Sequence, residues 1–380
     1  MDKIYLDHAA TSPMHPDVVD KMIPYMTKIF GNPSSIHHFG RQSRHALDEA
    51  RQSIADAIGA KASEVIFTSG GTEADNLGII GVALANREKG NHIITTAIEH
   101  HAVLHSCKYL ESLGFEITYL PVNEEGHVSL DEFKSSLRPN TILVSIMLGN
   151  NEVGSIQPIS EIGSLVAEHQ AYLHTDAVQA FGVVPINVNE LKIDLLSVSG
   201  HKINGPKGTG FLYIREGSRM VPNLYGGEQE RKRRAGTENV PGIVGLSNAV
   251  VLAAENFEKK KLEYVEFKYK FVDVLKQQDI EFSVNGQLDG GLPHILNIYF
   301  PGTNVESMLV NLDIAGISAS SGSACTAGSI DPSHVLVAMY GKTSERIASS
   351  IRFSFGYGNT MEQVERAAVE TARIVRRLTK

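Results

Sequence analysis

The sequence predicts an α/β fold: a mostly parallel sheet with helices on both faces, followed by a smaller α+β domain. Over the first two thirds of the chain, short apolar runs alternate with segments of helical period. This alternation is typical of parallel strands that are buried on both faces. The 380 residues, 42% of them hydrophobic and 21% charged, suffice for a large core divided between two domains.

Seven apolar runs are predicted to be the strands of the large sheet. Helices are predicted between them, over residues 72–87, 102–113 and 159–169. The predicted strands are residues 64–68, 92–95, 115–120, 141–147, 171–175, 194–198 and 210–214.

The pattern changes after residue 243. We interpret residues 243–278, which are helical in period and rich in charge, as a solvated helix that bridges two domains. Beyond it, short strands at 295–300 and 350–355 occur with helices at 304–312 and 360–378. We therefore expect a large domain at residues 15–255 and a small domain made of residues 1–14 and 256–380.

Charge and cysteine content exclude several classes of protein. The net charge of −8 gives no basic field for nucleic acid or anionic lipid, and the basic cluster at residues 231–234 is isolated. We see no secretory signal and no apolar run long enough for a membrane span. Two cysteines form no disulfide framework. We therefore expect a cytoplasmic protein without direct nucleic-acid or membrane partners.

Lys202 follows directly on a predicted core strand. The stretch SVSGHK, residues 197–202, leads from that strand into a loop rich in glycine. A lysine held where water is scarce loses its proton more easily and becomes a nucleophilic amine. That setting favours an imine with an aldehyde cofactor, above all pyridoxal phosphate. A surface lysine at a strand end is the alternative that these six residues leave open.

Two other strand ends carry groups that suit such a cofactor. Asp176 ends an apolar strand, where an acid needs a partner: a protonated pyridine nitrogen, an arginine or a helix cap. Asp176 and Lys202 are expected to face one crevice at the carboxyl ends of the strands. The turn SGGTE, residues 69–73, opens a helix whose amino terminus suits a phosphate, although a plain capped turn has the same sequence.

The stretch EHHAVLH, residues 99–105, contains three histidines. His100 lies between a predicted strand and helix, where it can stack on a planar cofactor or move protons. His101 and His105 are one helical turn apart, a spacing that can chelate a metal ion. No third ligand of matching pattern follows in the sequence, so we expect no metal.

The two cysteines and one arginine have distinct settings. Cys325 lies in a run of small residues, 318–329, that offers little to anchor it, and we interpret its thiol as reactive. Cys107 lies on the apolar face of a predicted helix and is assigned to the core. Arg352 lies inside an apolar strand, where its partner is either a substrate carboxylate or an internal acid.

These motifs, in this order, resemble those of the cysteine desulfurase family, pyridoxal-phosphate enzymes of fold type I, the aspartate aminotransferase-like fold. The resemblance runs from Tyr5 to the carboxyl end. It rests on eight motifs: GNPSS (31–35), SGGTE (69–73), EHHAV (99–103), NNEVG (150–154), HTDAVQ (174–179), SVSGHK (197–202), RAGTEN (234–239) and SGSAC (321–325).

The resemblance implies a mostly parallel seven-stranded sheet and a role for each motif. Lys202 is then the Schiff-base lysine, Asp176 pairs with the pyridinium nitrogen, and His100 stacks on the ring and assists proton transfer. Cys325 is the nucleophile. The remaining implied ligands are Asn151 and Gln179 for ring substituents, Gly71, Thr72, Ser199 and His201 for the phosphate, Thr237 for the phosphate from a second subunit, and Arg352 with Asn32 for the substrate carboxylate.

The implied activity is that of a sulfurtransferase: L-cysteine becomes L-alanine, and the sulfur stays on Cys325 as a persulfide. The segment around Cys325 is similar to the long-loop class of the family. The resemblance also implies a homodimer and a sulfur-acceptor protein. Because only 28 residues follow Arg352, fewer than in relatives with a scaffold-docking tail, a tRNA-thiolating acceptor and an iron–sulfur scaffold both stay open.

Two competing functions remain at this point. An aminotransferase or a selenocysteine-specific lyase on the same fold would tolerate the loss of Cys325. A sulfur carrier that has lost catalysis would not need the intact set of Lys202, Asp176 and Cys325.

Overall fold

The computed structural model describes residues 3–322 and 332–379. Its large sheet has the order β2-β8-β7-β6-β5-β3-β4. Strand β8 is antiparallel to β2 and β7, and the other neighbouring strands are parallel. The predicted α/β fold is therefore confirmed. The strands are β2 (Val65–Thr68), β3 (His92–Thr96), β4 (Glu116–Leu120), β5 (Thr141–Ser145), β6 (Tyr172–Asp176), β7 (Leu195–Ser199) and β8 (Gly210–Ile214).

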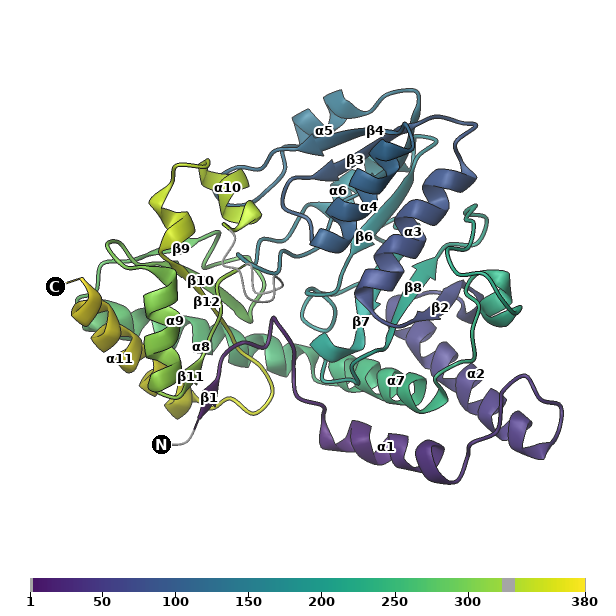
Figure 1. Cartoon of the computed structure of the whole chain (residues 1–380), viewed down its shortest axis with the longest axis horizontal. Coiled ribbons are helices and arrows are strands. Elements are labelled where there is room, and N and C mark those ends of the chain that lie inside the picture. The colour runs from purple at the N-terminus through teal and green to yellow at the C-terminus, as the bar shows by residue number, and fades with distance from the viewer. Residues whose placement is uncertain (1–2, 323–331, 380) are drawn as a thin grey trace.

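Helices pack on both faces of this sheet (Figure 1). In β7, Leu195 belongs to the apolar cluster beneath α3 and α4, whereas its neighbour Leu196 belongs to the larger cluster that includes α2 and α7. Successive side chains of a strand point to opposite faces, so β7 is buried on both. The helices are α1 (Pro16–Thr27), α2 (His38–Ile58), α3 (Gly71–Ala85), α4 (His101–Ser112), α5 (Leu130–Ser136), α6 (Ile159–Val166) and α7 (Val240–Glu255), with 3₁₀ helices η1 (Ala62–Glu64), η2 (Gly200–Lys202) and η3 (Gln229–Lys232).

A second, smaller body lies beside the large sheet, on the left in Figure 1. Its antiparallel sheet has the order β12-β10-β9. The amino-terminal strand β1 pairs in parallel with β11, so the first residues of the chain join its carboxyl-terminal third here. The elements are β1 (Ile4–Tyr5), α8 (Phe257–Gln277), β9 (Ser283–Asn285), β10 (Ile295–Tyr299), α9 (Val305–Ile314), β11 (Ile317–Ser318), α10 (His334–Tyr340), η4 (Glu345–Ala348), β12 (Ser350–Ser354) and α11 (Met361–Leu378).

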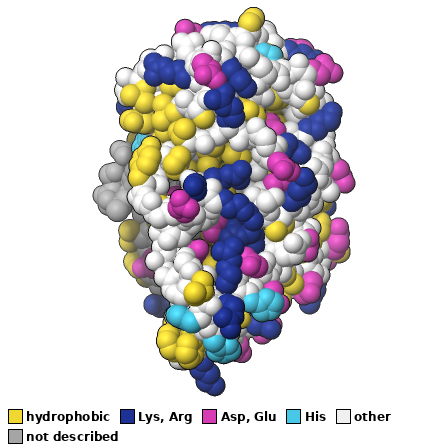
Figure 2. Space-filling model, turned by 90° about the vertical axis from the view of Figure 1, so that its right-hand side faces the viewer, with side chains coloured by type: hydrophobic (Ala, Val, Ile, Leu, Met, Phe, Trp, Pro, Cys, Tyr) yellow, Lys and Arg dark blue, Asp and Glu magenta, His cyan; other side chains and the backbone are white. Residues whose placement is uncertain are grey.

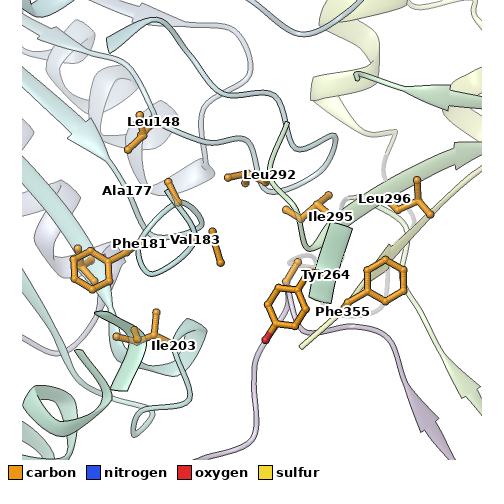
Figure 3. Close-up of a cluster of buried hydrophobic side chains, with 14 of the residues drawn as sticks. Leu148, Ala177, Phe181, Val183, Ile203, Tyr264, Leu292, Ile295, Leu296 and Phe355 are labelled. Carbon is orange, nitrogen blue, oxygen red and sulfur yellow. The ribbon is translucent and has the colours of Figure 1, made fainter. Parts of the chain in front are cut away.

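Buried apolar side chains from both bodies form one continuous cluster. Figure 3 shows Phe181 and Ile203, from the loops of the large sheet, on one side, and Tyr264 and Phe355, from the smaller body, on the other. We propose that the chain divides into a large domain, residues 15–255, and a small domain, residues 1–14 and 256–380. The pairing of β1 with β11 supports placing the first residues in the small domain.

The long helix expected at residues 243–278 is two helices, so that prediction was wrong in detail. Helices α7 and α8 are bent by 72° at the break between them. Asn256 lies at the break, and its side-chain amide donates to the carbonyl of Leu252 at 2.9 Å. Among the described residues, no single helix is long and apolar enough to cross a membrane; α7 and α8 reach that length and composition only as this bent pair.

Candidate active site

A cavity of about 520 Å³ opens where the strands of the large sheet end. Thr68 of β2 and Ser199 of β7 both pair with Gly210, so the ends of these strands meet at one edge. Loops after β2, β3, β5, β6 and β7 contribute to the lining, together with the amino-terminal residues Ala9–Thr11 and with Arg352 of β12. The volume suits a small-molecule cofactor with its substrate.

Lys202 lies in this cavity, in the short helix η2 directly after β7. Its side chain is half-buried. The Nζ donates to the carbonyl oxygens of Ala9 and, at 2.8 Å, of Ala10. The amino-terminal segment thus holds the Lys202 amine at the wall of the cavity, and Lys202 faces the crevice where the sequence placed it.

Asp176 faces the same cavity from the end of β6. One carboxylate oxygen accepts the backbone N–H of Val178 at 2.8 Å. Burial raises the pKa of Asp176 to about 6, although the Val178 hydrogen bond and the positive charge of Lys202 both act to lower it. A buried carboxylate held in this way is stabilised by a cation placed beside it.

A second carboxyl group, Asp75 of α3, lies behind Asp176. Burial, and next the charge of Asp176, raise the pKa of Asp75 well above its usual range. Its Oδ1 has no hydrogen-bond partner among the described residues, and His174 Nε2 lies 3.5 Å away. Ligand atoms of Asp75, His100 and Asp176 all lie within 4.8 Å of one another. This spacing also suits a divalent ion. The positive charge of Lys202 in the same cavity, however, repels a divalent ion more strongly than a singly charged organic cation, and so favours the organic cation.

His100 lines the cavity as the residue that caps α4. Its Nδ1 accepts the backbone N–H of Ala102 at 3.1 Å, which fixes the ring. Burial, and then the charge of Lys202, lower the pKa of His100 to about 4. The imidazole is therefore neutral at pH 7, when it can accept a proton.

The amino terminus of α3 forms a cradle for an anion at the other end of the cavity. Gly70 has a φ of 150°, and a Cβ added at Gly71 would lie 2.7 Å from a methyl group of Val178. The chain therefore needs glycine here to bring backbone N–H groups close to a ligand. Thr72, Ser199 and His201 also line the cavity, and Ser199 lies beside Gly70 and Gly71. Together these residues suit a phosphate.

Arg352 is buried in β12 and lines the cavity. Its guanidinium pairs with Asp7 at 3.0 Å and donates to the backbone oxygen of Asn151 at 2.8 Å. The Nε has no partner among the described residues. The internal acid that the sequence left open as one partner is therefore present, and the substrate carboxylate stays a prediction.

Comparisons with known proteins decide the family of this site. Residues 4–367 match the family model described as aminotransferase class-V. A putative cysteine desulfurase IscS 1 from Bacillus subtilis (strain 168) is 62% identical over 379 residues, all of both chains. The cysteine desulfurase IscS of Methanosarcina thermophila is 52% identical over 99% of this chain and 92% of its own. The chain belongs to the class-V aminotransferases, among the cysteine desulfurases.

Solved structures agree with this assignment. A NifS-like protein superposes with a TM-score of 0.92 at 35% identity, covering 98% of this chain and 99% of its own. A structure described as SspA in complex with cysteine superposes with a TM-score of 0.81 at 39% identity, covering 93% and 98%. The fold-type I architecture inferred from the motifs is therefore confirmed.

Most of the predicted cysteine desulfurase residues come together in the cavity, but two do not. Gln179 and Asn151 line it, and the Gln179 amide bonds the carbonyl of Ala9 at 2.9 Å and His294 at 3.2 Å. Asn32 and Thr237 are exposed and are not among the lining residues. Their roles stay predictions.

The two cysteines differ in what can be said of them. Cys325 lies outside the described residues, so its role also stays a prediction. Cys107 is fully buried on α4, and burial raises the pKa of its thiol to about 12. A thiol in that setting is not a nucleophile at neutral pH, in agreement with its assignment to the core.

The sequence did not reveal the contribution of Asp75 or of the carbonyl groups of Ala9 and Ala10. Asp75 had a weak signal, since it is an acid in the second turn of a helix that opens at a predicted phosphate cradle. The backbone carbonyls had none, because their position depends on how the amino-terminal segment crosses the cavity.

Proposed function

We propose that this cysteine desulfurase converts L-cysteine to L-alanine with pyridoxal phosphate as cofactor and leaves the sulfur on Cys325 as a persulfide. The observation that carries the proposal is the convergence of Lys202, Asp176 and His100 with the anion cradle of α3 in one cavity. When bound, pyridoxal phosphate supplies an electron sink for the charge that develops at the substrate Cα.

The cavity residues fit that cofactor from end to end. Gly71, Thr72, Ser199 and His201 would hold the phosphate, and Asp176 would pair with the ring nitrogen. One oxygen of Asp75, behind Asp176, has no partner among the described residues. This supports the fit, because a buried pair of acids is stabilised by one cation. His100 would lie on the face of the ring, with Asn151 and Gln179 at its substituents.

Each of the chain's own groups would then have a separate role in the reaction. Lys202 Nζ would hold the cofactor and would also carry the Cα proton. His100, whose ring is neutral because burial lowers its pKa, is the imidazole placed to take a proton from the attacking thiol. Arg352, with Asn32, would hold the substrate carboxylate. The thiolate of Cys325 attacks the substrate sulfur: the S–S bond forms, the C–S bond breaks, and its electrons and a proton complete alanine.

A homodimer is part of the proposal, since Thr237 would reach the phosphate of a neighbouring subunit. Exposed apolar side chains support a partner surface on the large domain: Phe30 is 72% exposed, Ile36 91% and Tyr225 85%. Figure 2 shows apolar and histidine side chains gathered at the lower end of the face that carries α2. Patches of this kind on one face are typical of interfaces.

The sulfur acceptor is proposed to be a protein, either one that thiolates tRNA or an iron–sulfur scaffold. We further propose a cytoplasmic location, where reducing conditions keep the Cys325 thiol available.

The deciding experiment measures alanine and sulfide together, from L-cysteine with a thiol reductant. Wild type should form both in equal amounts. Cys325→Ala should lose sulfide release, whereas the matched control Cys107→Ala should keep it once folded. Lys202→Ala should bind the cofactor but turn over negligibly. Sulfide release by Cys325→Ala at the wild-type rate would exclude the persulfide route and favour a lyase that needs no thiol.

A further inference from the structure

Three histidines meet outside the cavity, on the surface between α4 and α10. His101 and His105 lie one turn apart on α4, and His334 is the first residue of α10. The ring centroids of His101 and His334 are 4.7 Å apart, and those of His101 and His105 are 5.3 Å apart. The sequence showed only the α4 pair; the fold brings the third ring to it.

The separations match those of imidazoles bound to one ion. With metal–nitrogen bonds of about 2 Å and a tetrahedral angle, the centroids of two ligating rings lie about 5 Å apart. His101 thus has a neighbour on each side at the spacing that a shared ion requires.

The orientation of His334 is a second, independent observation. Its Nε2 lies 2.8 Å from the backbone oxygen of Glu99, and a carbonyl can only accept, so Nε2 carries the proton. The Nδ1 then keeps its lone pair. Metal-binding histidines typically donate their other ring nitrogen to a carbonyl or carboxylate in this way, which fixes the ring before the ion arrives.

In this structure, the ligand atoms of the three histidines are not all close to one another. Among the described residues, Asp75, His100 and Asp176 are the set whose ligand atoms all lie within 4.8 Å, and the three surface histidines are not. His105 is exposed on the helix surface, so its ring can turn without disturbing the core.

We propose that His101, His105 and His334 form a binding site for a transition-metal ion of the Zn²⁺ type, which joins α4 to α10. Three imidazoles without a carboxylate suit Zn²⁺, Co²⁺ or Ni²⁺ and not Ca²⁺ or Mg²⁺. The site is separate from the cavity and does not depend on the proposed reaction.

The test is a calorimetric titration of the tag-free holoenzyme with Zn²⁺, with Mg²⁺ as the ion expected not to bind. Dialysis followed by metal analysis should give one Zn²⁺ per chain. His334→Gln and His105→Gln should each weaken Zn²⁺ binding at least about tenfold. His45→Gln is the matched control, because this histidine is exposed on α2 beside a lone carboxylate, Glu49, at 3.3 Å.

A parallel titration in Cys325→Ser separates the histidines from the thiol. Zn²⁺ binding that persists there, and that His334→Gln still weakens, supports the proposal. Zn²⁺ affinity unchanged in both histidine variants, or lost in Cys325→Ser alone, would overturn it. Because His105 is exposed, His105→Gln is expected to keep the wild-type fold, which circular dichroism checks.

Discussion

At the residue scale, the cavity holds two buried carboxyl groups, Asp75 and Asp176, whose negative charges the surrounding residues stabilise poorly. Burial raises the pKa of Asp176 to about 6 and that of Asp75 well above its usual range. A carboxyl group whose folded pKa is raised contributes stability below its unfolded pKa of about 4, and this stability is lost as the pH rises through the folded value. The cofactor-free protein should therefore lose stability as the pH rises, and the cofactor should restore it.

Asp75→Asn tests this balance. The variant removes one buried acid and relieves Asp176, so the melting temperature of the cofactor-free variant should exceed that of wild type at pH 8. The difference should vanish below about pH 3, where both acids are protonated in the folded and unfolded states. Thermal melts across this pH range measure it. Asp48→Asn, which changes an exposed residue paired with Arg44, is the control and should alter little. A lower melting temperature for cofactor-free Asp75→Asn at pH 8 would contradict the account.

The residues that were predictable are those whose chemistry shows in local sequence. Lys202 and Asp176 each follow an apolar strand, and that position alone directs them to one edge of a parallel sheet. Asp7, which pairs with Arg352, was not predictable, because the partner of a buried arginine depends on contacts between residues far apart in the chain. For the same reason, the contact between the rings of His334 and His101 could not be predicted from the sequence.

At the element scale, strands of the large sheet were predicted to within a few residues, because burial on both faces leaves continuous apolar runs. The break between α7 and α8 was missed, since a helical period continues through Asn256 without a proline or glycine. Helices α1 and α2 were also missed. They precede the alternating pattern that guided the prediction, and α2 places its buried residues, such as Leu47 and Ile54, among many charged ones.

Helix α3 supplies a prediction at this scale, because two of its glycines have different surroundings. A Cβ at Gly71 would meet Val178 Cγ2 at 2.7 Å, whereas a Cβ at Gly78 would meet its nearest neighbours, Leu195 and Leu212, at 3.4 Å. Gly71→Ala should displace Val178 into the cradle and weaken binding of pyridoxal phosphate about tenfold or more, the loss of one charge-assisted hydrogen bond. Gly78→Ala should bind the cofactor as wild type does. Fluorescence titration of the cofactor-free proteins measures both. Equal affinities for the two variants would show that the cradle does not need the close approach.

At the scale of the whole molecule, the site is incomplete in one chain under the proposed function. Thr237 is exposed and outside the cavity, yet the loop before it is held firmly. Glu230 forms a buried ion pair with Arg51 at 2.6 Å and starts three successive residues with positive φ. Backbone strain of this kind persists only where the surroundings fix it. A surface loop fixed in this way, with its hydroxyl pointing at no local partner in the described structure, is suited to serve a neighbouring subunit.

Subunit complementation tests that arrangement. Thr237→Val removes one donor to the phosphate and should weaken cofactor binding about tenfold or more in a dimer of variant chains. Lys202→Ala chains should be inactive. A mixed dimer, purified through two different tags, pairs the intact Lys202 of one chain with the intact Thr237 of the other. If Thr237 acts across the interface, one site per mixed dimer is complete, and activity at limiting cofactor should return to about half that of wild type. If Thr237 acts within its own chain, both sites remain defective, and the mixed dimer should be no better than the Thr237→Val dimer.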